Sequence, residues 1–371
     1  MFRTFEAKNR KQMKIITIIG ARPQFVKAAM VSRAIINHNR NNNPPVEEYL
    51  LHTGQHYDKN MNAVFFEQLV IPRPTWLLDC GGGSHAEMTA RMLIEIENVL
   101  HENRPDYVLV YGDTNSTLAG ALAAAKLHIP VIHVEAGMRS FNRQMPEEIN
   151  RVLTDHLSVY LFCPTQVAIQ NLTREGITEG VFHVGDVMYD AALTFSKIAE
   201  KSSNILSDLH LETKSYYLCT VHRAENTDNR ERLSQIMEAL IEIALPECPV
   251  IMPLHPRTKK YIDSLQIESN NAFRLIEPVD YLDMIMLEKH AKTILTDSGG
   301  VQKEAYFHRT PCITLREDTE WVETIAAGWN QLAGYRKENI LLCLTKNIKH
   351  SVIEEYGNGH AADKIIQTLL Q

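Results

Sequence analysis

Several patterns that would place this chain in a common class of protein are missing from its sequence. None of the 371 residues belongs to an apolar stretch of membrane-spanning length, and no signal-type apolar core follows the charged start. The net charge is −7, and the basic residues are scattered as pairs such as Lys259 and Lys260. A chain without a basic block offers no electrostatic footprint for polyanions. We therefore expect neither a nucleic-acid partner nor a membrane partner.

Motifs for metals, disulfides and dinucleotides are also missing. The six cysteines form no C-x-x-C pair and mostly lie in apolar runs, as reduced core thiols do. The histidines lack an H-E-x-x-H pair, and the acids lack a D-x-D-x-D-G loop. No G-x-G-x-x-G fingerprint is present, which disfavours a nicotinamide cofactor. We expect a cytoplasmic protein whose chemistry requires no metal.

Apolar runs that suit buried parallel strands alternate with helical periodicity along most of the chain. The first run, KIITII at 14–19, ends at Gly20, and a helix begins near Pro23. The alternation continues through a helix expected near 61–69 to one at 147–157, and a second series starts with a strand at 216–220. This pattern predicts an α/β protein with two Rossmann-like, doubly wound halves facing each other across a cleft.

The domain boundaries follow from the same pattern. Residues 1–12 are expected to form a disordered extension, and 13–185 an N-terminal Rossmann-like domain. After the turn at 184–186, residues 186–351 form the C-terminal Rossmann-like domain. The segment 352–371 carries a closing helix that we expect to pack back on the first domain. Two cores are reasonable for a chain of this length.

Four carboxylates indicate an enzyme. Asp113 and Glu135 follow apolar strands, and Glu147 and Glu148 open a helix after a proline. Strand ends on one edge of a parallel sheet carry the ligand site, where ionisable groups serve chemistry rather than the core. Taken singly, Asp113 is a helix N-cap, and the two glutamates are favourable first-turn acids. Capping does not explain Glu135, which precedes Ala-Gly.

Two turns suit the binding of anions. In GARPQF, Arg22 lies where a strand meets a helix, and in LTDSGGVQKEA the same junction carries Ser298 and two glycines. Glu304, one turn into the second helix, could accept hydrogen bonds from a ribose diol. His222 in VHRAEN ends a strand and could donate to a phosphate or protonate a leaving group. Each turn alone also fits an ordinary capped helix, but the pair favours a nucleotide-diphosphate ligand.

The motifs together resemble one enzyme family. GARPQF, TGQHYD, GDTNSTLAGALAAAKLHIPVIHVEAG, PEEINR, HRAEN, LTDSGGVQKEA and LREDTEWVET occur in this order, and with them the chain closely resembles the non-hydrolysing UDP-N-acetylglucosamine 2-epimerases. The resemblance implies the two-domain glycosyltransferase-B fold, a homodimer and no redox cofactor. It implies inversion at C2 of a UDP-N-acetylhexosamine, by elimination of UDP to a 2-acetamidoglucal and re-addition.

The resemblance also assigns roles to residues. It places catalytic groups on Asp113, Glu135, Glu147 and His222. It places UDP contacts in the first domain on Arg22 and Lys27, and in the second domain on Ser298, Gly299, Gly300, Glu304 and Arg316. The chemistry agrees, because the C2 hydrogen becomes acidic once cleavage of the C1–O bond gives C1 cationic character. A carboxylate base and cations on the departing diphosphate are both required. Which carboxylate serves which face stays open.

A few positions differ from the usual family pattern. Gln24 stands where glutamate is common, Trp321-Val322 replaces Arg-Pro, and the loop from Glu135 to Glu147 is two residues shorter and contains Arg143. These features resemble the subgroup that acts on UDP-2,3-diacetamido-2,3-dideoxy-glucuronate. We expect Arg139 or Arg143 to pair with a sugar carboxylate, since a guanidinium binds that group through two hydrogen bonds.

The preferred interpretation is a cytoplasmic, homodimeric UDP-sugar 2-epimerase that supplies surface-polysaccharide synthesis. A hydrolysing relative that releases UDP and the free 2-epimeric sugar is the first alternative. A glycosyltransferase of the same fold would need an acceptor groove, and the acids around Glu135 disfavour it. A non-catalytic UDP-sugar binding protein would leave His222 and the acids unexplained.

Overall fold

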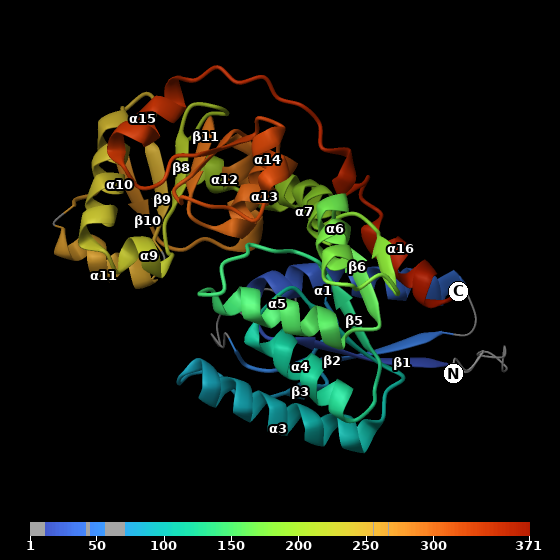
Figure 1. Ribbon diagram of the computed structural model, residues 1–371. Coiled ribbons are helices and arrows are strands. Elements are labelled where there is room, and N and C mark those ends of the chain that lie inside the picture. Colours follow the sequence, from blue (N-terminus) through green and yellow to red (C-terminus); the bar gives the residue numbers. More distant parts are fainter. Residues whose placement is uncertain (1–11, 42–44, 56–70, 255, 266) are drawn as a thin grey trace. The chain divides into compact units, whose positions relative to one another are not determined.

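The structure of the chain, a computed structural model, divides into two compact units (Figure 1). It describes residues 12–41, 45–55, 71–254, 256–265 and 267–371. One unit comprises 1–191 with 355–371, and the other 192–354. The expected extension at 1–12, apart from its last residue, and the expected helix at 61–69 lie outside the described residues. Among the described helices, none is long and apolar enough to cross a membrane.

The first unit is built on a parallel sheet of seven strands in the order β3-β2-β1-β4-β5-β6-β7. Neighbouring strands pair in parallel throughout, for example Ile15 with Glu48 on one side of β1 and with Tyr107 on the other. The chain order therefore reverses between β1 and β4, which is where open α/β sheets bind their ligands. The strands are β1 (Met13–Ile19), β2 (Val46–His52), β3 (Trp76–Leu77), β4 (Tyr107–Tyr111), β5 (Val131–Val134), β6 (Tyr160–Cys163) and β7 (Val181–His183).

Helices cover this sheet in two groups. Three of them pack in succession against each other, and α1 packs instead against the last helix of the chain (Figure 1). The closing helix thus belongs to the first unit. The helices are α1 (Arg22–Asn41) with α16 (Ala361–Leu369), the series α3 (His85–Asn103), α4 (Asn115–Lys126) and α5 (Pro146–Leu157), and α6 (Gln166–Arg174).

The second unit repeats the same topology. Its six parallel strands run in the order β10-β9-β8-β11-β12-β13, so its chain order reverses between β8 and β11. The strands are β8 (Tyr217–Thr220), β9 (Val250–Pro253), β10 (Phe273–Ile276), β11 (Thr293–Thr296), β12 (Cys312–Thr314) and β13 (Asn330–Leu332). Its helices are α8 (Ile205–Asp208), α9 (Ala224–Thr227), α10 (Arg230–Ile243), α11 (Pro256–Ser264), α12 (Tyr281–His290), α13 (Gly299–Phe307), α14 (Val322–Ala326) and α15 (Lys337–Thr345).

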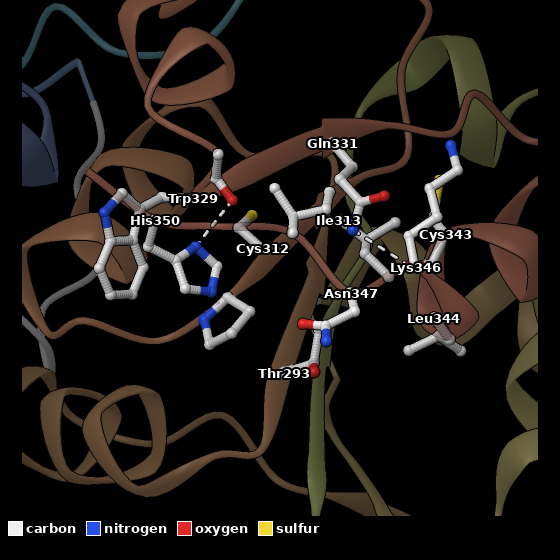
Figure 2. Close-up of a pocket in the computed structure, with 13 residues that line it drawn as sticks. Thr293, Cys312, Ile313, Trp329, Gln331, Cys343, Leu344, Lys346, Asn347 and His350 are labelled. Atoms are coloured by element: carbon white, nitrogen blue, oxygen red, sulfur yellow. Dashed lines mark hydrogen bonds between the residues drawn. The ribbon is translucent and has the colours of Figure 1, made fainter.

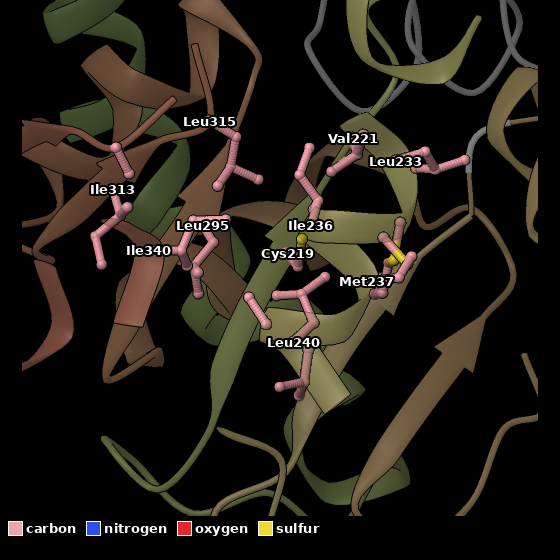
Figure 3. Close-up of a cluster of buried hydrophobic side chains, with 14 of the residues drawn as sticks. Cys219, Val221, Leu233, Ile236, Met237, Leu240, Leu295, Ile313, Leu315 and Ile340 are labelled. Atoms are coloured by element: carbon pink, nitrogen blue, oxygen red, sulfur yellow. The ribbon is translucent and has the colours of Figure 1, made fainter. Parts of the chain in front are cut away.

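Each sheet is buried on both faces, which explains why its strands read as continuous apolar runs rather than alternating ones. In the second unit, Cys219 and Val221 from the β8 segment contact Ile236 and Leu240 of α10, and Ile340 of α15 packs on the same cluster (Figure 3). These side chains are almost fully buried. The apolar area that they remove from water, at roughly 25 cal/mol per Å², is the main force that keeps helices on the sheet.

The sequence prediction of two doubly wound α/β halves is confirmed by the two parallel sheets. The placement of the halves across a cleft stays a prediction. Several short elements had no expected counterpart, among them β3, β13 and α14, because two to five residues carry too little periodicity to detect.

Both points where the chain passes between units are fastened inside the first unit. The first lies within α7 (Val187–Ser202), and the second in a 3-10 turn at Glu354–Tyr356. Asp186 donates its N–H to the Tyr356 carbonyl at 3.0 Å. One turn later, the Asp190 carboxylate accepts the Ala362 N–H at 2.8 Å, at the start of α16. Burial raises the pKa of Asp190 to about 6, although the α16 amides oppose the shift.

The Asp190 carboxyl makes stability depend on pH. Its folded pKa of about 6 exceeds the value of about 4 in an unfolded chain, so the folded state binds the proton more tightly. Stability from this group is therefore present below pH 4 and is lost as pH rises to 6, by roughly 3 kcal/mol at about 1.4 kcal/mol per pH unit. We expect Asp190→Asn to lose less stability than the wild type over this range in urea unfolding. A difference between the two proteins that does not change with pH would contradict this expectation.

Candidate active site

The residues singled out by sequence lie where the chain order reverses in each sheet. In the first unit, Gly20 follows β1, Asp113 follows β4 and Glu135 follows β5. In the second, His222 follows β8 and Ser298 follows β11. These are the carboxyl ends of parallel strands, so the fold itself gathers each group at one sheet edge. The two groups belong to different units and are described separately.

The turn after β1 is closed by Gln24 rather than left open for an anion. Its Oε1 accepts the N–H groups of Gly20 at 2.8 Å and Ala21 at 3.0 Å, and its Nε2 donates to the Tyr111 carbonyl at 2.9 Å. A Cβ at position 20 would lie 2.1 Å from Thr53 Oγ1, so glycine is required there. These two N–H groups already have an internal partner, and a phosphate at this turn stays a prediction. The Arg22 side chain lies outside the described residues, and its role stays a prediction.

Glu135 is paired with a buried lysine. The Lys27 Nζ lies 2.6 Å from Glu135 Oε2, and both side chains are largely buried. Glu135 itself has φ +71°, in the left-handed region that a residue with a Cβ rarely adopts. Such a conformation costs of order 1 kcal/mol or more, and here it aims an acid after a strand end. Lys27, which the resemblance assigns to UDP, contacts this acid, and its role toward UDP stays a prediction.

Asp113 is held by α5 and does not cap α4. The cap is Thr114, whose side chain accepts the Thr117 N–H. Arg151 Nη2 donates instead to Asp113 Oδ2, and Asn150 Nδ2 donates to the Asp113 carbonyl at 2.9 Å. Side chains four and five residues after Pro146, the first residue of α5, thus fix both the backbone and the carboxylate of Asp113.

Glu148 anchors the loop that precedes α5. Its carboxylate accepts the N–H groups of Ser140 and Phe141, each at 2.9 Å, and the Ser140 hydroxyl at 2.9 Å. The Arg151 Nη1 lies 3.3 Å from Glu148 Oε2, which links this loop to Asp113 through one guanidinium. The sequence indicated only a favourable first-turn acid at this position. Glu147, one residue earlier, is partly exposed at the same helix start.

The structure separates the two arginines expected to bind a sugar carboxylate. The Arg139 guanidinium is almost fully buried and donates to the Met138 carbonyl, to Asp155 at 2.7 Å and to both oxygens of Glu175 at 2.7 Å. Burial opposes its charge, but the carboxylates outweigh burial and raise its pKa. Arg139 is therefore a structural cation, and the expectation that it binds the sugar is wrong. Arg143 is exposed in the loop.

In the second unit, a buried aspartate that sequence reasoning missed organises the segment around His222. Asp297, fully buried, accepts the N–H groups of His222 and Arg223, each at 3.0 Å, and the Asn226 amide at 3.1 Å. The His222 Nδ1 lies 3.6 Å from Asp297 Oδ1, and the imidazole is about one third exposed. The available signal was the position of Asp297 in D-S-G-G, directly after an apolar strand. Sequence reasoning passed over it because an aspartate is rarely buried unless it is paired.

The start of α13 has the form expected of an anion site. Ser298 caps the helix, and a Cβ at position 299 would lie 2.6 Å from Glu320 Oε1, so a larger residue would displace that carboxylate. A Cβ at position 300 would meet only Ser298 Oγ, at 3.9 Å. A helix start with uncovered backbone favours negative charge. Glu304, one turn on, is hydrogen-bonded to Tyr281.

Arg316 follows β12 and lies among three carboxylates. Its guanidinium contacts Asp318 at 2.8 Å, Glu320 at 3.1 Å and Glu225 at 3.7 Å. Burial opposes the charge, but the carboxylates raise the Arg316 pKa. Asp318 and Glu225 are about half exposed, whereas Arg316 is buried. A diphosphate at Arg316 would therefore compete with movable acids, and this contact stays a prediction.

A measurable cavity of the second unit lies at the opposite strand ends. Its volume is about 160 Å³, and it is lined by Thr293 and Cys312, which begin β11 and β12, and by Trp329 stacked on His350 (Figure 2). Ser298 and Arg316 follow the other ends of the same strands. The cavity is therefore separate from the predicted nucleotide site. Among the described residues, no cluster of His, Cys, Asp and Glu could hold a metal ion.

Comparison with known proteins agrees with this geometry. The sequence model of the UDP-N-acetylglucosamine 2-epimerases matches residues 38–370. This chain belongs to that family. It is 50% identical to the UDP-2,3-diacetamido-2,3-dideoxy-D-glucuronate 2-epimerase of Pseudomonas aeruginosa, over 96% of this chain and 99% of the relative. It is 53% identical to a UDP-N-acetylglucosamine 2-epimerase homolog of Methanococcus maripaludis, with the same coverage.

Solved structures extend the comparison to the epimerase fold. The UDP-GlcNAc 2-epimerase of Methanocaldococcus jannaschii, in complex with UDP-GlcNAc and UDP, has a TM-score of 0.85 and 47% identity over 97% of this chain and 99% of its own. The enzyme of Neisseria meningitidis bound to UDP-GlcNAc has a TM-score of 0.86 and 32% identity, over 96% and 100%. The family inferred from the motifs is thereby confirmed.

The Glu148 anchor can be tested through the loop that it holds. In Glu148→Gln, one carboxylate oxygen becomes an NH₂ that faces a backbone N–H, so the loop should open more often. If the substitution weakens the hydrogen bonds that hold the loop by about 1–2 kcal/mol, the fraction of molecules with an open loop rises roughly 5- to 30-fold. Tryptic cleavage after the exposed Arg143 should accelerate accordingly, because cleavage follows the open population. Glu147→Gln is the matched control and should cleave at the wild-type rate. Equal rates for all three proteins would disprove the anchor.

Proposed function

We propose that this protein is a non-hydrolysing UDP-sugar 2-epimerase that eliminates and re-adds UDP at a sugar C1–C2 bond. The observation that carries the proposal is the Lys27–Glu135 pair at a strained strand end, beside the switch point where Asp113 is fixed by α5. A carboxylate that is oriented and largely shielded from water can act as a base in a way that a surface acid cannot. Membership of the epimerase family supports the reaction type.

The reaction balances without an oxidant. The C1–O bond breaks as the electron pair leaves with UDP, a carboxylate removes the C2 proton, and a 2-acetamidoglucal forms. UDP oxygen then adds back to C1, and a proton reaches C2 from the other face. Acids on both faces are needed, and we assign them to Asp113, Glu135 and Glu147. We assign the departing diphosphate to the α13 start and to the cations Arg22, His222 and Arg316.

We further infer that the sugar is a uronate. The P. aeruginosa relative acts on UDP-2,3-diacetamido-2,3-dideoxy-D-glucuronate and is 50% identical, whereas the M. jannaschii UDP-N-acetylglucosamine 2-epimerase is 47% identical. These identities do not decide between the sugars. Arg143 favours the uronate, because it is exposed on the loop between Glu135 and Glu147 and makes no ion pair with any described residue. Because Arg139 is excluded, Arg143 is the remaining candidate for binding the sugar carboxylate.

The wider setting follows from the family resemblance. We infer a homodimer that works in the cytoplasm and supplies surface-polysaccharide synthesis. The six cysteines support a reducing compartment, since all are free and five are buried. Neither the assembly nor the pathway enters the tests below.

The proposed reaction is tested by proton NMR in D₂O, with UDP-N-acetylglucosamine and its diacetamido-uronate analogue. Deuterium should enter C2 of a sugar still attached to UDP. Glu135→Gln should slow this exchange roughly 10²- to 10⁴-fold, the range for loss of a general acid or base. The exposed Glu179 provides the matched control, and Glu179→Gln should exchange normally. Free UDP with free sugar would instead indicate a hydrolysing enzyme, and no exchange with either sugar would sink the proposal.

The assignment of Arg143 has its own test. If its guanidinium binds the sugar carboxylate, Arg143→Ala should raise KM for the uronate roughly ten- to hundredfold, because hydrogen bonds to charged groups contribute about 1.5–3 kcal/mol. KM for UDP-N-acetylglucosamine, which lacks that carboxylate, should not change. Arg174→Ala, at another exposed arginine of the same unit, is the control. An unchanged KM for the uronate would show that another residue selects the sugar.

A further inference from the structure

A fully buried histidine lies directly behind the candidate catalytic acids. His133 belongs to β5, two residues before Glu135, and its side chain has no exposed area. Its Nε2 lies 2.7 Å from the Gly112 carbonyl oxygen, and its Nδ1 lies 2.7 Å from Asp155 Oδ1. Gly112 immediately precedes Asp113. The imidazole thus connects the turn that carries Asp113 to the last turns of α5.

The partners decide where the protons are. A carbonyl oxygen can only accept, so Nε2 carries a proton. The Nδ1 proton could formally reside on Asp155 instead, but Asp155 Oδ2 accepts from Arg139 Nη1 at 2.7 Å and from the Gly137 N–H at 3.1 Å. Those donors favour an ionised carboxylate. Burial opposes ionisation of Asp155, yet His133 and Arg139 outweigh it and keep its pKa below the usual range.

The carboxylates near His133 could balance a positive charge on its ring in addition to that of Arg139. Arg139 and His133 face Asp155, and Arg139 also binds Glu175 through both oxygens. Arg139 and a doubly protonated His133 would therefore meet two carboxylates, and His156 lies 3.5 Å from Glu175 at the exposed rim. Buried charges persist only when they are paired and hydrogen-bonded, and this set meets that condition. An imidazolium here needs no compensation from solvent.

A second buried histidine of the same sheet shows the opposite arrangement. His52 Nδ1 accepts the Gly54 N–H at 2.8 Å, so that nitrogen carries no proton. Burial lowers the His52 pKa to about 4, and the ring is neutral at pH 7. Two equally buried imidazoles in one unit thus have different hydrogen-bond partners. His52 serves as the internal reference for His133.

We propose that His133 is a positioning residue that donates from both ring nitrogens, to the Gly112 carbonyl and to Asp155, and so fixes the Gly112–Asp113 turn for proton transfer. This inference rests on the proposed epimerase function. Gly112 has φ +60°, and its N–H donates to the Val134 carbonyl at 3.0 Å, so His133 adds a second bond at the carbonyl of the same residue. His133 fixes the peptide before Asp113, Asn150 binds the carbonyl after it, and Arg151 binds its carboxylate. Charge-assisted bonds near 2.7 Å are roughly twice as strong as neutral ones, which suits rigid orientation of an acid.

The protonation state is measured directly in the full-length protein labelled with ¹⁵N-histidine. His133, assigned by its loss in His133→Gln, should show two protonated ring nitrogens at pH 7. His52 should show one protonated and one unprotonated nitrogen at the same pH. An unprotonated nitrogen on His133 at pH 7 would overturn the proposal. The spectrum requires no turnover, so this result is independent of whether the epimerase reaction itself is found.

Kinetics test the positioning role. A glutamine can still donate to the Gly112 carbonyl but carries no charge, so His133→Gln should lower kcat roughly ten- to hundredfold while KM and UDP affinity stay near the wild-type values. A merely structural defect would reduce the folded fraction and would be seen as a matching loss of UDP binding sites. An unchanged kcat, or losses of kcat and binding sites in equal proportion, would overturn the positioning role.

Discussion

The first unit depends on one buried carboxylate, that of Asp155. From α5 it accepts hydrogen bonds from His133 in the central sheet, from Arg139 and from the Gly137 N–H, and so joins a helix, a strand and a loop. Removing it would leave Nδ1 of His133 and one side of the buried Arg139 guanidinium without their shared partner, and breaking a buried ion pair costs several kcal/mol. The same helix presents Arg151 and Asn150 to Asp113, and Glu148 to the loop at 140–141. Placement of the candidate acids therefore follows from how α5 is fixed.

A parallel device orders the second unit. Asp297 lies directly after β11 and accepts hydrogen bonds from the segment after β8, which carries His222. In both sheets the carboxylate bridges elements on either side of the ligand-binding edge, so each candidate site is built by an internal anion rather than by exposed residues. Exposed residues that the anchors do not hold, such as Arg143, remain available to contact a bound sugar. One fold can therefore carry sites for different ligands.

Much of the fold was predictable because long apolar runs and helical periodicity are local signals. The apolar run at 14–19 lies within β1, and the strand and helix expected at 216–220 and 147–157 agree with β8 and α5 to within one residue at each end. Positions after strand ends also predicted that Asp113 and Glu135 lie at one edge of the sheet. Partners far apart in sequence were not predictable, since nothing local pairs Asp113 with Arg151 or Asp297 with His222. For the same reason Arg139 and Arg143 looked equivalent, although one is neutralised by Asp155 and Glu175.

The sequence by itself determined the α/β class, the order of the elements and the family, because hydrophobic period, glycine turns and a series of specific motifs are written along the chain. Only the tertiary structure decided which polar side chains are anchors and which remain available to a ligand. Glu148 and Glu147 are neighbours with the same chemistry, yet one is buried against backbone N–H groups and the other partly faces solvent. Burial and hydrogen-bond partners come from packing, and they fix charge state and orientation in ways that residue type cannot.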